Sequence, residues 1–313
     1  MTTWLGDPSL VVLAGALALD ALAGEPPDRL HPVVWIGRTI GWLTARAPQR
    51  GPIAQLAAGL AIAIAVPAAF TAAAVALTVW AGGSIVATVI AIWVLKSMFA
   101  ARALGEAGRA VRDPLAHGDL AAARFALRSL CSRDPGRLDE RQLAAATVES
   151  LAENASDSVV APLCFYALFG LPGAVCYRAV NTLDAMIGYR GKYEHLGKAA
   201  ARLDDALNLI PARITAGLLL VAGAVCGADV RGGWRILVRD GGATASPNAG
   251  RPMATMAGLL GVRLDKPGHY QLGDDLAPVT PATIDRAWRI VAVALAGAAA
   301  LCAIAVAARA VRW

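Results

Sequence analysis

The sequence predicts an all-α, polytopic membrane protein with about four to six transmembrane or re-entrant helices, joined by cytoplasmic amphipathic helices and loops. Hydrophobic residues make up 57% of the 313 residues, and charged residues only 17%. The mean hydropathy is +0.53, and all three values lie outside the usual range of soluble domains. We therefore expect one integral membrane domain across residues 1–313, with a cytoplasmic helical insert at about 101–157 and a cytoplasmic polar loop at about 229–286.

Long apolar segments account for the expected membrane helices. Residues 10–23 form the first one, and no Lys or Arg precedes it while Asp20 lies inside it, so a retained helix is expected rather than a cleaved signal peptide. Lys96 lies near the end of a later span, where its side chain should reach toward the lipid headgroups. Further spans are expected at residues 53–80, 84–100 and 287–308.

Prolines mark two places where a regular span is not expected. The pairs Pro26-Pro27 and His31-Pro32 predict an ordered turn region over residues 24–43, a re-entry turn at the membrane surface rather than more helix. The alternative is a ligand site, for which the polar candidates are Asp20, Glu25, His31 and Arg38.

Two later apolar segments are also atypical as spans. Residues 159–177 contain Pro162 and Pro172, and residues 214–226 are short for a crossing. Because irregular backbone at membrane depth is tolerated when protein surrounds it, we expect re-entrant or buried helices at both places.

Charge sets the expected topology. The net charge of +6 comes mainly from Arg in the connecting segments, which places residues 24–50 and 102–142 in the cytoplasm and the N-terminus outside. Within the second of these segments, Asp119 is the predicted N-cap of a helix through Leu130. No basic stripe interleaved with aromatic residues is present, so nucleic acid is not an expected partner. The five cysteines and four histidines form neither a CxxC pair nor a zinc motif.

Acidic residues on one predicted helix are the strongest sign of a functional site. Glu149, Glu153 and Asp157 recur at intervals of four, so a helix over residues 143–157 would carry their carboxylates on one face, with Asn154 at its edge. Each such pair of like charges costs about a few tenths of a kcal/mol on an isolated helix. A compensating cation or basic ligand is the natural inference, and a solvated acidic face is the alternative.

Residues 159–177 form an apolar segment, and a second polar cluster begins directly after it. If the apolar segment folds back, this cluster meets the acidic residues that precede the segment. Carboxylates and amides suit a hard cation such as Mg2+, and guanidinium groups suit phosphate. No Walker A, GxGxxG, GxSxG or HExxH pattern is present, so a transporter is as credible as an enzyme on this chemistry alone. The second cluster comprises Arg178, Asn181, Asp184, Tyr189, Arg190 and Lys192, and the loop SPNAGRP adds Ser246, Asn248 and Arg251.

Five sequence blocks resemble the successive signatures of the cobalamin biosynthesis proteins CobD and CbiB, the membrane-bound adenosylcobinamide-phosphate synthase family. They occur in the family's order from residue 20 to about residue 275, and together they are specific although each alone is weak. Two departures keep the charge, since Glu25 stands where Asp is expected and Arg190 where Lys is common. The blocks are DALAGEPPDRLHPVVWIGRTI, SRDPGRLDE, VESLAENASDSVVAPLCFYALFGLPGAVCYRAVNTLDAMIGYR, ARLDDALNLIPARITA and SPNAGRPMATMAGLLGVRL.

The resemblance implies an ATP-dependent amide ligase that joins (R)-1-aminopropan-2-ol, or its O-phosphate, to adenosylcobyric acid. ATP and Mg2+ would be the cofactors, the corrinoid and the amine the substrates, and other membrane enzymes of late cobalamin assembly are candidate partners. The protein would be a multi-pass protein of the inner membrane with its active-site loops in the cytoplasm. A non-catalytic signalling protein, or a corrinoid-binding or transport protein of related fold, is the alternative.

Residue roles follow from the resemblance together with the chemistry. The expected metal ligands are Glu149, Glu153, Asp157 and Asp184, and the same four residues with Lys192 are the expected catalytic groups. The expected substrate-binding or phosphate-binding residues are Asn154, Arg178, Asn181, Tyr189, Arg190, Ser246, Asn248, Arg251, His31 and Asp20.

Overall fold

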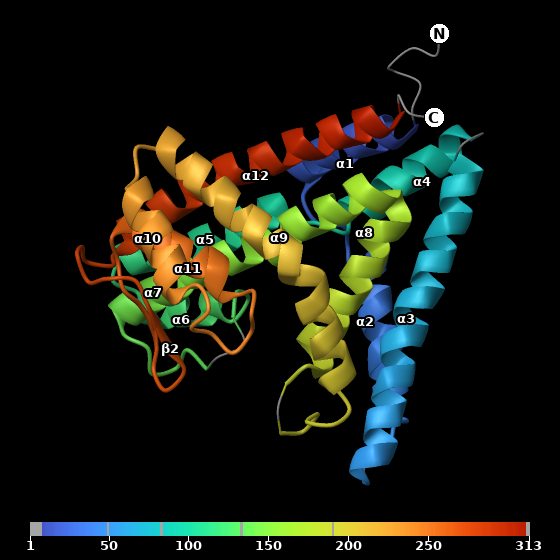
Figure 1. Ribbon diagram of the computed structural model, residues 1–313, viewed down its shortest axis with the longest axis horizontal. Helices are drawn as coiled ribbons and strands as arrows, with labels where there is room; N and C mark the ends of the chain where they lie inside the picture. The colour runs from blue at the N-terminus through green and yellow to red at the C-terminus, as the bar shows by residue number, and fades with distance from the viewer. Residues whose placement is uncertain (1–7, 49, 82–83, 132–133, 190, 311–313) are drawn as a thin grey trace. The chain divides into compact units, whose positions relative to one another are not determined.

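Helices make up nearly all of the regular structure in the computed structural model, which describes residues 8–48, 50–81, 84–131, 134–189 and 191–310 (Figure 1). Within these residues the strands are β1 (Leu264–Lys266) and β2 (Tyr270–Leu272). Five helical segments are long and apolar enough to cross a membrane, which confirms the all-α membrane class. They are Pro52–Ala81, Ile85–Ala116, Glu140–Ile187, Lys198–Val225 and Pro281–Arg309.

The chain folds into two compact units. Unit 1 comprises Met1–Ala100, Ala161–Leu207 and Ala299–Trp313, and unit 2 comprises Ala101–Val160 and Asn208–Ala298. Both polar regions that the sequence sets apart, residues 101–157 and 229–286, belong to unit 2.

In unit 1, α1 (Pro8–Ala23) packs against α4 (Ile85–Lys96), and α3 (Pro52–Ala81) packs against α8 (Ala161–Ile187). Helix α2 (Pro32–Thr44) lies against α3 and α8, as Figure 1 shows. The buried core between these helices includes Ile36, Ile40, Ile62, Val66 and Leu183.

Helix α2 corrects the predicted turn over residues 24–43. The turn ends at His31, which has an extended conformation with φ −84° and ψ 113°, and whose ring nitrogen Nδ1 accepts a hydrogen bond from Val33 N at 3.2 Å. Pro32 then occupies the first helical position, where the missing N–H and the fixed φ suit a helix start. The His31-Pro32 pair therefore begins a helix instead of continuing the turn.

Helix α8 is broken at Gly170. This residue has φ 68° and ψ −159°, a combination that only glycine adopts readily. The rings of Phe165 and Tyr177 stack with centroids 5.1 Å apart, whereas twelve residues of straight helix would separate them by about 18 Å. The chain therefore folds back inside the apolar segment at residues 159–177. This is the geometry that a re-entrant helix requires, and its depth in a membrane stays a prediction.

Helix α9 (Lys198–Val225) corrects the view that residues 214–226 form a short apolar segment by themselves. The helix continues through Pro211 and has 28 residues, long and apolar enough to cross a membrane. The polar residues of its first turns concealed this length in the sequence.

In unit 2, α7 (Glu140–Ala155) packs against α5 (Ala101–Ala116), α6 (Leu120–Leu127) and α11 (Gly250–Leu260). Asp119 caps α6 by accepting a hydrogen bond from Ala122 N at 2.9 Å, as predicted, although the helix ends at Leu127. Helix α10 (Val230–Asp240) packs closely on α11 because Gly232 and Gly258 present only backbone at the crossing. Helix α12 (Pro281–Ala310) contains the predicted last span.

The polar loop at residues 229–286 contains structure that the sequence did not predict. Strands β1 and β2 pair in antiparallel fashion, with Leu264 opposite Leu272. Both leucines are buried, so the hairpin is fastened to unit 2 by its apolar side chains.

Candidate functional site

The predicted acidic face lies on α7 and on η1 (Ser156–Val160), a π-helical turn that follows α7 directly. Glu149 and Glu153 belong to α7, and Asp157 belongs to the π turn. A single regular α-helix over residues 143–157 is therefore wrong in its last turn. Short π-helical turns inserted in α-helices often occur at functional sites. The π turn therefore supports the prediction of a functional site in this region.

The predicted magnesium ligands do not form a metal cage within the described residues. No group of three or more His, Cys, Asp or Glu side chains that could hold a metal ion is found in the described parts of the chain. Glu149, Glu153 and Asp157 belong to unit 2, whereas Asp184 belongs to unit 1. A Mg2+ site that uses all four carboxylates stays a prediction, and no chemical step below is assigned to a metal.

Glu149 is the most buried of the acidic residues, with 3% of its surface exposed. Tyr270 in β2 donates a hydrogen bond from its hydroxyl to Glu149 Oε2 at 3.3 Å. A buried carboxylate requires such partners, because burial without hydrogen bonds costs free energy. Tyr270 therefore orients a residue of the acidic face. Tyr270 is not among the predicted site residues, because the segment at residues 229–286 is predicted to be a loop rather than to contain a hairpin.

The side chain of Asn154 forms hydrogen bonds with residues one turn before and one turn after it. Its Nδ2 donates to Ser150 O at 2.9 Å, and its Oδ1 accepts from Ser158 Oγ at 3.3 Å. The amide therefore stabilises the junction between α7 and the π turn.

The loop SPNAGRP is held together by its own hydrogen bonds. Thr244 Oγ1 donates to Ser246 O at 2.7 Å and accepts from Gly250 N at 3.0 Å, and Ser246 Oγ accepts from Asn248 N at 3.3 Å. Asn248 is buried, with 4% of its surface exposed. The loop is thus a fixed structure that leads into α11.

Arg251 lies in the first turn of α11, which begins at Gly250. No side-chain hydrogen bond caps this helix, and a cation is unfavourably placed at a helix N-terminus. Among the described residues, the buried Nε of Arg251 has no hydrogen-bond partner. Both features fit an anionic ligand at this residue.

The prediction that the Lys96 side chain reaches the lipid headgroups is wrong. It is fully buried in unit 1, and its Nζ lies 3.2 Å from Asp20 Oδ1 and 2.6 Å from Glu25 Oε1. Two carboxylates thus neutralise the ammonium inside the protein, which removes the need for contact with water. The signal in the sequence was Asp20, an acidic residue inside the apolar segment that packs against α4.

His31 joins this buried group through Glu25. Because His31 Nδ1 accepts the hydrogen bond from Val33, its Nε2 carries the proton and donates to Glu25 Oε2 at 3.0 Å. Burial raises the pKa of Glu25, but the hydrogen bonds and charges of His31 and Lys96 outweigh burial and hold that pKa below its usual value of 4.5. Asp20 and His31, both predicted ligand residues, therefore make contacts that fix the turn at residues 24–31.

A series of hydrogen-bonded polar side chains in unit 1 connects α8 with α9. Arg178 Nη1 donates to Asn181 Oδ1, and Asn181 Nδ2 donates to Asp204 Oδ1, each at 3.3 Å. Asp184 lies half-buried further along α8. The structure thus brings Arg178 and Asn181 together as predicted and adds Asp204, which the sequence analysis did not single out.

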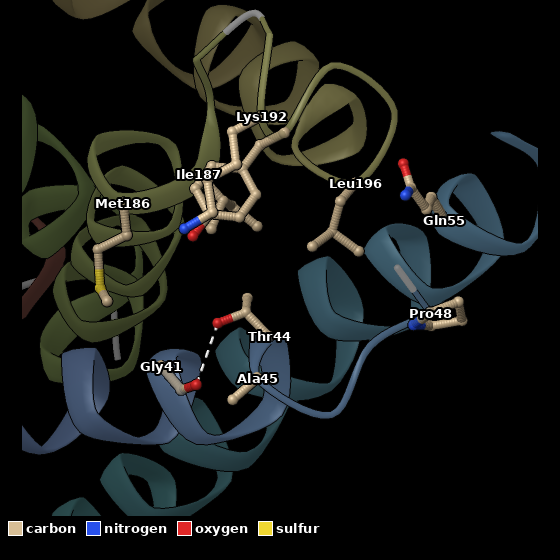
Figure 2. Close-up of a pocket in the computed structure, with 10 residues that line it drawn as sticks. Gly41, Thr44, Ala45, Pro48, Gln55, Met186, Ile187, Lys192 and Leu196 are labelled. Carbon is tan, nitrogen blue, oxygen red and sulfur yellow. Dashed lines mark hydrogen bonds between the residues drawn. The ribbon is translucent and has the colours of Figure 1, made fainter. Parts of the chain in front are cut away.

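Lys192 lines a cavity of about 330 Å³ within unit 1, shown in Figure 2. Tyr189 precedes it and is 49% exposed, and Arg190 lies outside the described residues. The cavity could not be predicted from the sequence, because its walls come from segments that are far apart in the chain. The cavity is lined by Gly41, Thr44, Ala45, Pro48, Gln55, Met186, Ile187, Lys192, Tyr193 and Leu196.

Long apolar helices with buried ion pairs and hydrogen-bonded polar side chains between them define a polytopic helical membrane protein. The sequence model of the CobD/Cbib protein family matches residues 13–291, and the chain belongs to this family. A role in cobalamin biosynthesis follows from this membership.

Similar proteins agree with this assignment. The chain is 45% identical over 277 residues to cobalamin biosynthesis protein CobD of Dehalococcoides mccartyi, covering 88% of this chain and 90% of that protein. It is 45% identical over 266 residues to probable cobalamin biosynthesis protein CobD of Thermococcus kodakarensis, with 84% and 85% covered. It is 39% identical over 291 residues to cobalamin biosynthesis protein CobD of Geobacter metallireducens, with 89% of each covered. No solved structure matches the chain.

Proposed function

We propose that the protein is an ATP-dependent amide ligase that joins (R)-1-aminopropan-2-ol, or its O-phosphate, to the propionate of ring D of adenosylcobyric acid. The observation that carries this proposal is the family match over residues 13–291, which includes the predicted polar residues of both units.

The reaction requires activation of a carboxylate. Attack of the corrinoid carboxylate on the terminal phosphorus of ATP forms an acyl phosphate and releases ADP. The amine then attacks the acyl carbon, phosphate leaves, and a base accepts the proton of the amine. Catalysis of such transfers depends on positioning and on stabilising charge.

The polar residues of this chain suit these tasks. The acidic residues of α7 would accept the amine proton, and Glu149 is already oriented by Tyr270. Arg251, which belongs to the same unit as α7, would stabilise charge on the transferring phosphoryl group, since guanidinium groups bind phosphate oxygens well.

A cytoplasmic active site on an inner-membrane protein is part of the proposal, because ATP and cobyric acid are cytoplasmic. It rests on the Arg and Lys content of residues 24–50, 102–157, 178–213 and 229–286. Single cysteines replacing Lys198 and Lys266 in a cysteine-free background should be labelled only from the cytoplasmic side. Labelling of either from the periplasm would contradict this topology.

The decisive assay uses the full-length chain in lipid nanodiscs. We expect ADP release from ATP and cobyric acid only when aminopropanol or its phosphate is added, together with formation of the amide. The variants Glu153→Gln and Asp157→Asn should abolish synthesis while the protein stays folded, because both lose a carboxylate of the acidic face. ADP release that does not depend on the amine, or normal turnover in both variants, would count against the proposal.

A further inference from the structure

Helix α10 carries two parallel rows of side chains outside its buried face. Residues at intervals of four lie one above another on a helix, so each row follows the helix axis. One row is apolar and comprises Val230, Trp234 and Val238. The row beside it is basic and comprises Arg231, Arg235 and Arg239. Trp234 and Val238 are 60% and 66% exposed, and the three arginines are exposed as well, so α10 presents an amphipathic surface to its surroundings.

The opposite face of α10 is fixed within unit 2. A Cβ at Gly232 would lie 2.9 Å from the carbonyl oxygen of Gly258 in α11, so the two helices touch through their backbones. They lie side by side in Figure 1. The buried residues of α10 are Gly232, Gly233, Ile236 and Leu237. Because this contact sets the rotation of α10, the apolar and basic rows point away from α11.

The end of α9 places α10 close to the membrane surface. Helix α9 is long and apolar enough to cross a membrane, and it ends at Val225, five positions before α10 begins. A Cβ at Gly233 would lie 3.0 Å from Leu220 Cδ2, and Leu220 precedes the end of α9 by about 7.5 Å along the helix axis. Val221 and Val225 are exposed in these last turns, which suits contact with lipid. Helix α10 therefore lies beside the turns of α9 that leave the hydrocarbon core.

The basic row contains a guanidinium that can bind an external anion. Arg235 and Arg239 each pair with Asp274 at 2.8 Å, and Arg239 also pairs with Asp240 at 2.6 Å. For Arg231, no ion pair is found in the described parts of the chain. An exposed guanidinium of this kind is suited to phosphate oxygens.

A phospholipid surface matches both rows of α10. Tryptophan favours the headgroup level, because its ring is apolar and its N–H group is polar. Arginines beside an apolar row can reach lipid phosphates while the apolar side chains enter the boundary of the acyl chains. The apolar row of α10 also adjoins the exposed Val221 and Val225 of α9, which favours lipid over a protein partner.

We propose that α10 is an interfacial helix that binds anionic phospholipid, with Trp234 and Val238 at the boundary of the acyl chains and Arg231 and Arg235 at the headgroup phosphates. The inference goes beyond the proposed function and does not rest on the ligase reaction. Because the loop SPNAGRP lies between α10 and α11, lipid bound to α10 would hold this loop near the membrane surface.

Fluorescence quenching by brominated lipid gives a local test. The full-length chain is placed in nanodiscs of phosphatidylcholine and phosphatidylglycerol in equal amounts, with bromine in the acyl chains of one lipid at a time. The chain has eight tryptophans, so the signal of Trp234 is the fluorescence of each protein minus that of the same protein with Trp234→Phe. We expect an association constant for phosphatidylglycerol at least about fivefold above that for phosphatidylcholine, since one basic side chain near an anionic surface contributes such a factor. In about 1 M salt, where screening is strong, the preference should disappear.

Variants of one arginine test the basic row. Arg231→Gln should lower the association constant for phosphatidylglycerol about fivefold, whereas Arg231→Lys should retain most of it, because the attraction requires charge. Arg137→Gln is the matched control, since it removes an exposed charge from another part of unit 2, and it should change nothing.

The two parts of the proposal can be overturned separately. Equal quenching of Trp234 by the two brominated lipids would overturn the selectivity for anionic lipid. Absence of quenching by either lipid would overturn the contact of α10 with the membrane. A disulfide between two chains that carry Val238→Cys in a cysteine-free background would then assign this face to a second copy of the chain.

Discussion

Lys96 Nζ lies 2.6 Å from Glu25 Oε1, although 71 positions separate the two residues in the chain. With Asp20 on the other side of the ammonium, this contact joins the turn at residues 24–31 to the end of α4. Trp93 strengthens the connection by donating from Nε1 to Leu30 O at 3.2 Å. These contacts hold the turn at residues 24–31, which leads into α2, against α4.

Replacing Lys96 tests how much its ion pairs contribute to stability. Lys96→Met should destabilise the protein by on the order of 3 kcal/mol, because it leaves two carboxylates without their shared cation. Thermal unfolding in detergent measures the loss, and Lys198→Met serves as the surface control. Adding Asp20→Asn to Lys96→Met should recover part of the stability. A single variant as stable as the unaltered chain would show that the ion pairs contribute nothing.

The pKa of Glu25 predicts how stability responds to acid. Because its pKa in the folded protein lies below 4.5, ionised Glu25 contributes stability above that pH, and the contribution is lost as the pH falls through the folded pKa. The groups that face it are Lys96 and His31, with Asp20 on the far side of the ammonium. The stability difference between the unaltered chain and Glu25→Gln should persist from about pH 7 to pH 5 and shrink below pH 4.5. A difference that shrinks already near pH 6 would contradict this account.

Tyr270 should matter for catalysis through Glu149. Tyr270→Phe removes the hydroxyl that donates to Glu149 Oε2, at a cost of about 1 kcal/mol, or roughly fivefold in kcat/KM. The loss should fall on kcat rather than on the KM values, because Tyr270 acts by orienting Glu149. Unchanged kcat in Tyr270→Phe would show that Tyr270 contributes only to packing.

Arg251 should bind an anion. Arg251→Ala should weaken ATP or the phosphorylated amine by on the order of 2 kcal/mol, the scale of a lost charge-assisted hydrogen bond. Arg251→Lys keeps the charge but loses the planar fork, so it should recover only part of the affinity. If KM for both ligands is unchanged in an active Arg251→Ala variant, the loop SPNAGRP is a structural turn.

Composition and apolar length were sufficient to predict the fold class. A transmembrane helix requires about 20 apolar residues, and this local property can be read directly for α3 and α12. Capping is equally local, so Asp119 was identified as an N-cap from its neighbours alone. The placement of Glu149 and Glu153 on one regular helix could also be predicted, because their spacing is a local property of the sequence.

The remaining features depend on contacts between distant residues. Lys96 was expected to reach the headgroups because its partners, Asp20 and Glu25, lie more than 70 positions away. The cavity beside Lys192 combines three segments that are separately unremarkable in sequence. The meeting of Glu149 with Tyr270 likewise depends on a hairpin whose strands have only three residues each.

Gly170 has a consequence for how the protein enters the membrane. A straight helix over residues 159–177 would be about 28 Å long, close to the full thickness of the hydrocarbon core. The insertion machinery would then treat it as a complete crossing, and every later segment would emerge on the opposite side. Gly170→Ala favours that outcome because alanine does not adopt the backbone conformation of the break. If the segment re-enters as predicted, the missing side chain of Gly170 is expected to keep Arg178 and the rest of its cluster on the side of the membrane from which the segment enters.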